Sequence, residues 1–210
     1  MMQFRQKIVK GLQHAFLVTL ALSALPGYAE ETSSPTVVME TSEGTLHIVL
    51  DPQGAPLSTQ NFLQYVNDGF YDGTVFHRVI PGFMVQGGGF TEDFTQKNTR
   101  AAITNESAPE LRNLRGTLAM ARTQAPHSAT AQFFINLVDN PHLDARQPGS
   151  GYAVFGRVVE GMDVVDRMAA IPTQNRGFMR DVPQKAITIL SVRVDKSAAP
   201  AAPQATPSQE

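Results

Sequence analysis

An arginine, Arg78, and a glutamine, Gln86, lie within a mainly apolar, strand-like stretch at residues 76–91 (FHRVIPGFMVQGGGFT). The guanidinium of Arg78 is planar and always charged, so it can donate hydrogen bonds to an atom on which electron density develops during a reaction. Most arginines, however, only extend their heads into solvent. Phe83 and Met84 would ordinarily be core residues, and Gln86 would ordinarily end a strand. The residue pattern alone therefore leaves catalytic and structural interpretations open.

Several familiar kinds of catalytic site are missing from the sequence. It has no G-x-S-x-G, P-loop or H-E-x-x-H pattern. The absence of cysteine excludes thiol nucleophiles, disulfides and zinc–thiolate sites. The five histidines lack the spacing of metal ligands, so we expect no metal and no other cofactor. Residues 87–89 are three glycines, but no helical pattern follows them, and we expect a tight turn with close backbone approach.

The charge balance argues against polyanionic partners. The formal net charge is −2, and the first 29 residues hold three of the 17 basic residues and no acidic one. The remainder therefore carries 14 basic and 19 acidic residues. Nucleic acids and anionic membrane surfaces attract basic faces, and this composition supplies none. We expect no nucleic-acid partner and no membrane partner after removal of the N-terminal segment.

The N-terminal segment has the composition of an export signal. Three basic residues within the first ten positions precede an apolar run at 15–25, which is too short to span a bilayer. The segment ends in Pro26-Gly27-Tyr28-Ala29, with small residues at the positions that a signal peptidase reads. We therefore expect residues 1–29 to be a cleavable signal peptide.

The remaining chain is long enough for one domain with a substantial core. Residues 30–35 form a polar leader, and we place the folded domain at 36–195. Residues 196–210 are rich in Ala, Pro, Ser and Gln and have no periodic apolar face, so we expect a disordered tail.

The periodicity of the domain predicts many short strands and two helices. Residues 37–41 and 45–50 form a hairpin around Ser42-Glu43-Gly44. One helix opens at Pro56 and is closed by Gly69. A second helix covers residues 161–170. The other strand-like runs lie at 74–79, 83–86, 117–121, 133–137, 152–158 and 186–194.

The last of these runs is expected to place Leu190, Val192 and Val194 on one face, because side chains alternate along a strand. Short strands with two widely spaced helices are typical of a closed barrel that carries a helix at each end.

The segment at residues 76–88 (FHRVIPGFMVQGG) resembles the signature of the cyclophilins. Further segments agree in order and spacing, and the resemblance covers about residues 37–194. It is greatest to the periplasmic cyclophilins of Gram-negative bacteria. The further matching segments are Asn61-Phe62, Gly116 to Arg122, Gln132 to Ile135, Tyr152 to Gly156 and Gly161-Met162.

The resemblance implies a mainly β fold, a closed eight-stranded antiparallel β-barrel capped by two α-helices. It implies a peptidyl-prolyl cis–trans isomerase whose substrates are unfolded or proline-containing exported polypeptides. We expect the protein to be periplasmic and monomeric. An alternative hypothesis is a periplasmic chaperone or holdase that uses the same groove, with catalysis incidental.

The resemblance also implies individual roles. Arg78 corresponds to the catalytic arginine, and Gln86 and Gln132 correspond to two glutamines that bind the peptide backbone. The walls and far rim of the proline pocket correspond to Phe83, Met84, Phe134 and Leu143.

Three substrate-binding positions depart from the common pattern of the family. Arg122 stands where many relatives have asparagine, although there the main chain makes the contact with substrate. His142 replaces a tryptophan of many eukaryotic members, and Tyr152 replaces a rim histidine.

Overall fold

The structure is a computed structural model that describes residues 34–196. The strands are β1 (Thr36–Thr41), β2 (Gly44–Leu50), β3 (Thr74–Ile80), β4 (Met84–Thr91), β5 (Thr117–Met120), β6 (Phe133–Asn136), β7 (Val154–Glu160), β8 (Thr173–Arg176), β9 (Met179–Pro183) and β10 (Ile189–Val194). The helices are α1 (Pro56–Asn67), the short 3₁₀ helix η1 (Pro141–Leu143) and α2 (Met162–Ala170).

Three of the predicted segments fall wholly or largely outside this range. The predicted signal peptide at 1–29 lies outside the described residues, as do residues 30–33 of the leader and 197–210 of the tail. Within residues 34–196, no helix has the length and apolar character needed to cross a membrane.

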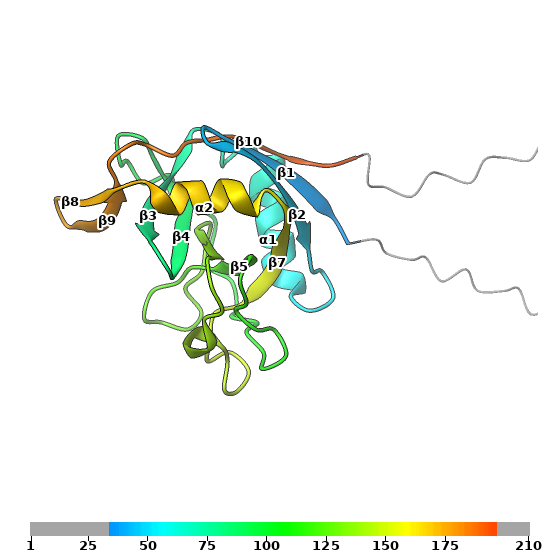
Figure 1. Ribbon diagram of the computed structural model, residues 1–210. Helices are drawn as coiled ribbons and strands as arrows, with labels where there is room; N and C mark the ends of the chain where they lie inside the picture. The colour runs from blue at the N-terminus through cyan, green and yellow to red at the C-terminus, as the bar shows by residue number, and fades with distance from the viewer. Residues whose placement is uncertain (1–33, 197–210) are drawn as a thin grey trace, which may run out of the picture. The chain divides into compact units, whose positions relative to one another are not determined.

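Eight strands form one antiparallel sheet in the order β10-β1-β2-β7-β5-β6-β4-β3. Backbone bonds bring its two edges together: Phe76 N donates to Ile187 O, and Gly73 N donates to Ile189 O, both at 2.9 Å. The sheet therefore curves into a nearly closed barrel (Figure 1). Each of the eight strand-like runs in the sequence corresponds to one barrel strand, so the predicted fold class is confirmed.

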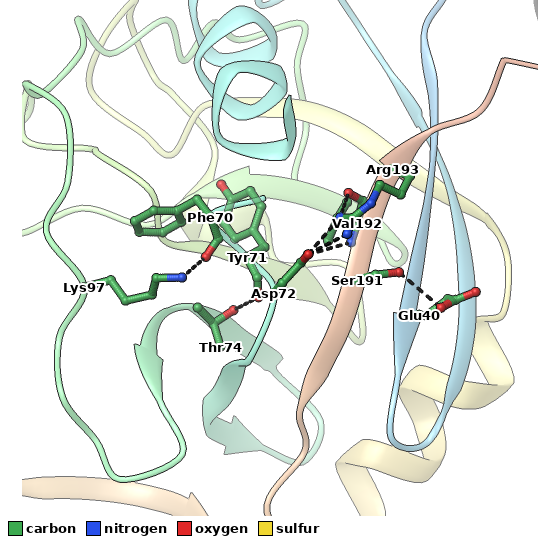
Figure 2. Close-up of polar contacts among 9 residues, drawn as sticks. All are labelled: Glu40, Phe70, Tyr71, Asp72, Thr74, Lys97, Ser191, Val192 and Arg193. Atoms are coloured by element: carbon green, nitrogen blue, oxygen red, sulfur yellow. Dashed lines mark hydrogen bonds and ion pairs between the residues drawn. The ribbon is translucent and has the colours of Figure 1, made fainter. Parts of the chain in front are cut away.

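A side-chain ion pair strengthens the closure. Figure 2 shows Asp72, just before β3, facing Val192 and Arg193 of β10. Its Oδ1 accepts from Arg193 Nη1 at 2.9 Å and from Val192 N at 3.3 Å. The hydrogen bonds from Arg193 hold the pKa of Asp72 below its ordinary value. The carboxylate therefore stays charged to lower pH than an isolated aspartate, and its bonds tie one edge of the sheet to the other.

Alternation along the strands divides the apolar side chains between two clusters. On β6, Phe133 and Ile135 lie in the barrel core, whereas Phe134 belongs to a second cluster with Met84 of β4. The reason is that successive side chains of a strand point to opposite faces of the sheet. Both faces of this part of the barrel are therefore apolar, and the second face is available for a binding site.

Both helices pack into the barrel core. Phe62 of α1 is fully buried against Tyr71, Phe133 and Phe155. Val165 and Met168 of α2 are fully buried in the same cluster. The two predicted helices are thus confirmed.

The start of α1 is capped from a distant loop. Ala55 at the N-cap position supplies no side-chain hydrogen bond, and Pro56 begins the helix. The carboxylate of Glu106 instead accepts from Leu57 N at 2.9 Å and from Ser58 N at 2.7 Å. Backbone N–H groups in the first turn lack intrahelical partners, so this carboxylate satisfies donors that the local sequence leaves open.

Two local predictions are wrong. Leu190 is 56% exposed, whereas Ile189 and Val192 are buried. Glu40 pairs with Ser191 and Thr41 with Ile189, so a β-bulge leaves Leu190 as the extra residue. The bulge shifts the alternation by one position, and Leu190 therefore does not share a face with Val192.

Residues 87–89 do not form a tight turn but continue β4. The expected close backbone approach is present, because a Cβ at Gly88 would lie 2.8 Å from ring carbons of both Tyr71 and Phe133. Gly88 also has φ of 79°, a conformation that favours glycine.

The hairpin of β8 and β9 was not predicted. It forms a separate two-stranded sheet and packs beside β3, as Figure 1 shows. Its strands are largely polar and exposed, so they carry little of the alternation that identifies half-buried strands.

Candidate active site

A pocket lies on the outer face of the barrel, over the second apolar cluster. Its floor is formed by buried side chains of β4, β5 and β6 and by Leu143 of η1. The residues that line it are Arg78, Phe83, Met84, Gln86, Ala121, Arg122, Phe134, Leu143 and Tyr152. Eight of the ten residues predicted from the sequence therefore line one pocket.

A bulge in β3 directs Arg78 to this face. Phe76 pairs with Gly87 and Arg78 with Gln86, so His77 is an extra residue. Phe76 and Val79 can then both face the core while Arg78 faces outward beside Gln86. The Arg78 Nε donates to Asp181 Oδ2 of β9 at 3.4 Å. The guanidinium thus stands at the pocket edge next to an amide side chain.

His77 itself is buried beside the site. Its ring packs on Phe90 with centroids 4.8 Å apart, and Nδ1 has no hydrogen-bond partner among the described residues. Burial lowers the pKa of His77 to about 4, and the nearby charge of Arg78 acts in the same direction. The imidazole is therefore neutral at neutral pH and adds no charge to the site.

Gln132 does not line the pocket, but it is bonded to a residue that does. Gln86 Nε2 donates to Gln132 Oε1 at 3.0 Å. The side chain of Gln132 lies over Gly89, where a Cβ would stand 2.5 Å from its Cγ. The two glutamines thus form one unit whose remaining amide groups can bind a polypeptide backbone.

His142 also lies outside the pocket lining, and it is exposed on η1. Its ring stacks on the ring of Phe83, with centroids 5.4 Å apart and planes 28° apart. His142 therefore extends the apolar rim that Phe83 begins.

Arg122 and Tyr152 form the opposite wall. The guanidinium carbon of Arg122 lies 4.5 Å from the centre of the Tyr152 ring, and that ring meets Phe134 edge-on. Arg122 also donates to the carbonyls of Thr123 and Gly151 at 3.0 and 3.2 Å. These contacts hold the Arg122 side chain as part of the wall.

Sequence reasoning missed two residues of the site. Ala121 lines the pocket directly after β5, and its small side chain gave no signal of its own. Asp181 contacts Arg78, although the two residues are 103 positions apart in the chain. No sequence pattern linked Asp181 to the site, because the hairpin that carries it was not predicted.

The arrangement can bind and polarise a ligand but offers no thiol, serine hydroxyl or carboxylate as a nucleophile. The pocket combines an apolar floor, a guanidinium and amide groups, and no cysteine, serine or carboxylate lines it. Within residues 34–196, no group of three or more His, Asp or Glu side chains could hold a metal ion. A site of this kind suits a reaction in which no covalent bond is made to the enzyme.

An antiparallel barrel with two helices packed against its core and an arginine-edged apolar pocket on its outer face is the arrangement expected for a cyclophilin. Residues 36–194 match the model of the family described as cyclophilin type peptidyl-prolyl cis-trans isomerase. The chain therefore belongs to the cyclophilin family, and it is a peptidyl-prolyl cis–trans isomerase.

Relatives over the full domain agree with this assignment. The chain is 50% identical over 187 residues to peptidyl-prolyl cis-trans isomerase A of Dickeya dadantii, with 89% of this chain and 98% of that protein covered. It is 51% identical over 163 residues to peptidyl-prolyl cis-trans isomerase B of Escherichia coli, with 76% and 99% covered.

Solved structures agree as well. A cyclophilin of Cryptosporidium parvum, crystallised in the presence of the dipeptide Ala-Pro, has a TM-score of 0.67 and 28% identity, with 76% of this chain and 98% of that chain covered.

Proposed function

We propose that this enzyme accelerates the isomerisation of X–Pro bonds during the folding of exported proteins in the periplasm, with Arg78 as its catalytic residue. The observation that carries the proposal is the position of the Arg78 guanidinium at the edge of an apolar pocket lined by Phe83, Met84 and Phe134. A prolyl ring is compact and apolar and suits this pocket, and a related cyclophilin was crystallised with a proline dipeptide.

The chemistry requires no covalent step. Rotation about a peptide bond meets a barrier of about 18–20 kcal/mol, because resonance must be broken. In the twisted transition state the prolyl nitrogen recovers a lone pair, which can accept a hydrogen bond. A donor aimed at that nitrogen binds the twisted state more tightly than either planar state, which is the requirement for catalysis.

The size of this effect limits what Arg78 can contribute. A hydrogen bond to a charged group contributes about 1.5–3 kcal/mol net, and each tenfold in rate requires about 1.4 kcal/mol. Arg78 alone therefore accounts for about one to two decades of acceleration. The apolar pocket contributes further by excluding water, which stabilises the planar, more polar amide.

The glutamine pair meets a second requirement of the reaction, which is that the peptide on one side of the proline be held fixed. Gln86 and Gln132 are bonded to each other at 3.0 Å and lie next to Arg78, which pairs with Gln86 across β3 and β4. We propose that their free amide groups hold the peptide on one side of the proline while the other side turns.

The first test is an isomerisation assay on a proline-containing peptide with the purified protein and its Arg78→Ala variant. We expect the variant to keep its melting temperature and to lose about tenfold or more of kcat/KM. Arg78→Lys should also be impaired, because an ammonium cannot reproduce the planar fork. Wild-type turnover in Arg78→Ala would refute the catalytic role. Suppression of aggregation by the inactive variant would favour the holdase alternative.

The location requires a separate test. The basic and apolar segments within residues 1–29 support export, and cleavage after Ala29 would leave Glu30 as the first residue. We expect the intact mass of the protein recovered from the periplasmic fraction to correspond to residues 30–210. Recovery of the uncleaved chain from the cytoplasm would contradict export.

A further inference from the structure

The guanidinium of Arg78 is held by a carboxylate from outside the barrel. Arg78 lies on β3, and Asp181 lies on β9 of the separate β8–β9 hairpin. Arg78 Nε donates to Asp181 Oδ2 at 3.4 Å. Among the described residues, this is the only hydrogen bond that the Arg78 guanidinium makes, and neither of its two Nη atoms has a hydrogen-bond partner. The bond therefore restrains the guanidinium through Nε and leaves both Nη atoms available to a ligand.

We propose that Asp181 is a positioning residue, which holds the Arg78 guanidinium in the orientation needed at the twisted prolyl bond. This inference rests on the catalytic role proposed for Arg78. A long, flexible arginine side chain would otherwise have to be ordered when the transition state forms, and that ordering opposes catalysis. A carboxylate that orders the guanidinium before the transition state forms lowers this entropic cost.

The backbone at Asp181 supports a dedicated role. Asp181 has φ of 59°, in the left-handed region that residues other than glycine seldom adopt. Aspartate and asparagine tolerate this conformation better than other side chains. In this conformation the carboxylate lies within hydrogen-bond distance of Arg78 on β3, and the next two residues, Val182 and Pro183, are buried. The hairpin is thus anchored immediately beside Asp181, and strained residues held in this way are frequent at functional sites.

Stability alone does not account for the pair. The Arg78 and Asp181 side chains are 42% and 38% exposed, and ion pairs with this exposure contribute little to folding stability. Loss of the pair should therefore be visible in catalysis and nearly silent in melting temperature. There is a competing electrostatic effect, because the carboxylate also screens the charge of Arg78. If screening dominated, removal of Asp181 would raise kcat. The sign of the change in kcat therefore distinguishes positioning from screening.

The experiment compares Asp181→Gly, which preserves the backbone conformation without the carboxylate, with Asp181→Asn, which keeps an acceptor without the charge. We expect kcat to fall by about three- to tenfold in Asp181→Gly and by less in Asp181→Asn, with KM changed by less than about twofold. Asp166→Asn is the matched control, because Asp166 forms an ion pair of similar exposure with Arg115, and neither residue lines the pocket. The control should keep wild-type kcat.

A double-mutant comparison tests whether Asp181 acts through Arg78. In an Arg78→Ala background, Asp181→Gly should cause no further loss of kcat. An unchanged or raised kcat in Asp181→Gly, or a rise in KM alone, would overturn the inference. If Arg78→Ala is impaired and Asp181→Gly is not, only the positioning role fails. If Arg78→Ala itself retains wild-type turnover, the proposed function fails first.

Discussion

Gln86 of β4 donates from Nε2 to Oε1 of Gln132, 3.0 Å away and just before β6, so two strands of the barrel share one polar unit beside the pocket. The geometry of this unit depends on a glycine. A Cβ at Gly89 would lie 2.5 Å from Gln132 Cγ and 2.7 Å from its Nε2. No other residue type at position 89 leaves Gln132 where it is.

The first prediction follows from that contact. Gly89→Ala should push the Gln132 side chain aside, break its bond to Gln86 and weaken the grip on the peptide backbone. We expect KM to rise by about three- to tenfold with a smaller change in kcat, since Arg78 is untouched. Gln132→Ala is the comparator and should reproduce the same KM effect. Steady-state kinetics that show a wild-type KM in Gly89→Ala would contradict the role of the glutamine pair.

The second prediction concerns acid stability and His77. Burial lowers the pKa of His77 to about 4, from an ordinary value of 6.5 that the unfolded chain should retain. The unfolded state therefore binds this proton more tightly, and stability is lost as the pH falls from 6.5 toward 4. Above about pH 7 the histidine imposes no penalty, and at about pH 4 the penalty reaches about 3 kcal/mol.

Urea unfolding at several pH values measures this loss. His77→Phe removes the titrating group and keeps an aromatic ring against Phe90, so its unfolding free energy should fall less steeply between pH 6.5 and 4. Carboxylates such as Asp72 titrate in both proteins and cancel in the difference. Parallel pH profiles for the two proteins would show that His77 does not carry the effect.

The third prediction addresses the remote cap of α1. Glu106→Ala removes the acceptor for Leu57 N and Ser58 N and should destabilise the domain by about 1–2 kcal/mol. Glu106→Gln keeps an acceptor but loses the charge near the helix N-terminus, so its loss should be smaller. Glu110→Ala, at an exposed position of the same loop, is the control. Equal melting temperatures for Glu106→Ala and the control would refute the capping role.

The fourth prediction concerns cyclosporin, the cyclic peptide that inhibits many cyclophilins. In sensitive relatives a tryptophan offers a broad apolar face and an indole N–H donor where this chain has His142. Here the imidazole stacks on Phe83 and covers less area. Loss of a donor contact costs about 1–3 kcal/mol, and lost area adds to that. We expect inhibition weaker than in those relatives by about ten- to a thousandfold.

His142→Trp should recover much of that affinity, while turnover of a small proline peptide changes by less than about twofold, because the pocket floor lies among Met84, Phe134 and Leu143. A titration of cyclosporin against the unmodified protein and His142→Trp measures the two affinities. Tight inhibition of the unmodified protein would mean that the residue at position 142 matters less than argued.

The sequence by itself determined which segments would become barrel strands and most of the residues that line the pocket. Strand alternation is local, so the runs around Ile48, Val79 and Phe133 were visible without any knowledge of their partners. The pocket residues from Arg78 to Gln86 share one short segment, and their resemblance to a known signature required no tertiary information.

Tertiary structure alone decided features that depend on partners distant in the chain. The cap on Ser58 comes from Glu106, 48 residues away, and the carboxylate beside Arg78 comes from Asp181, 103 residues away. The bulge that exposes Leu190 depends on its pairing with β1. Such contacts form only when the barrel closes, and no local pattern of side chains specifies which distant residue will arrive. The sequence therefore indicated that Arg78 belongs to the pocket, and the fold decided that Asp181 holds its guanidinium.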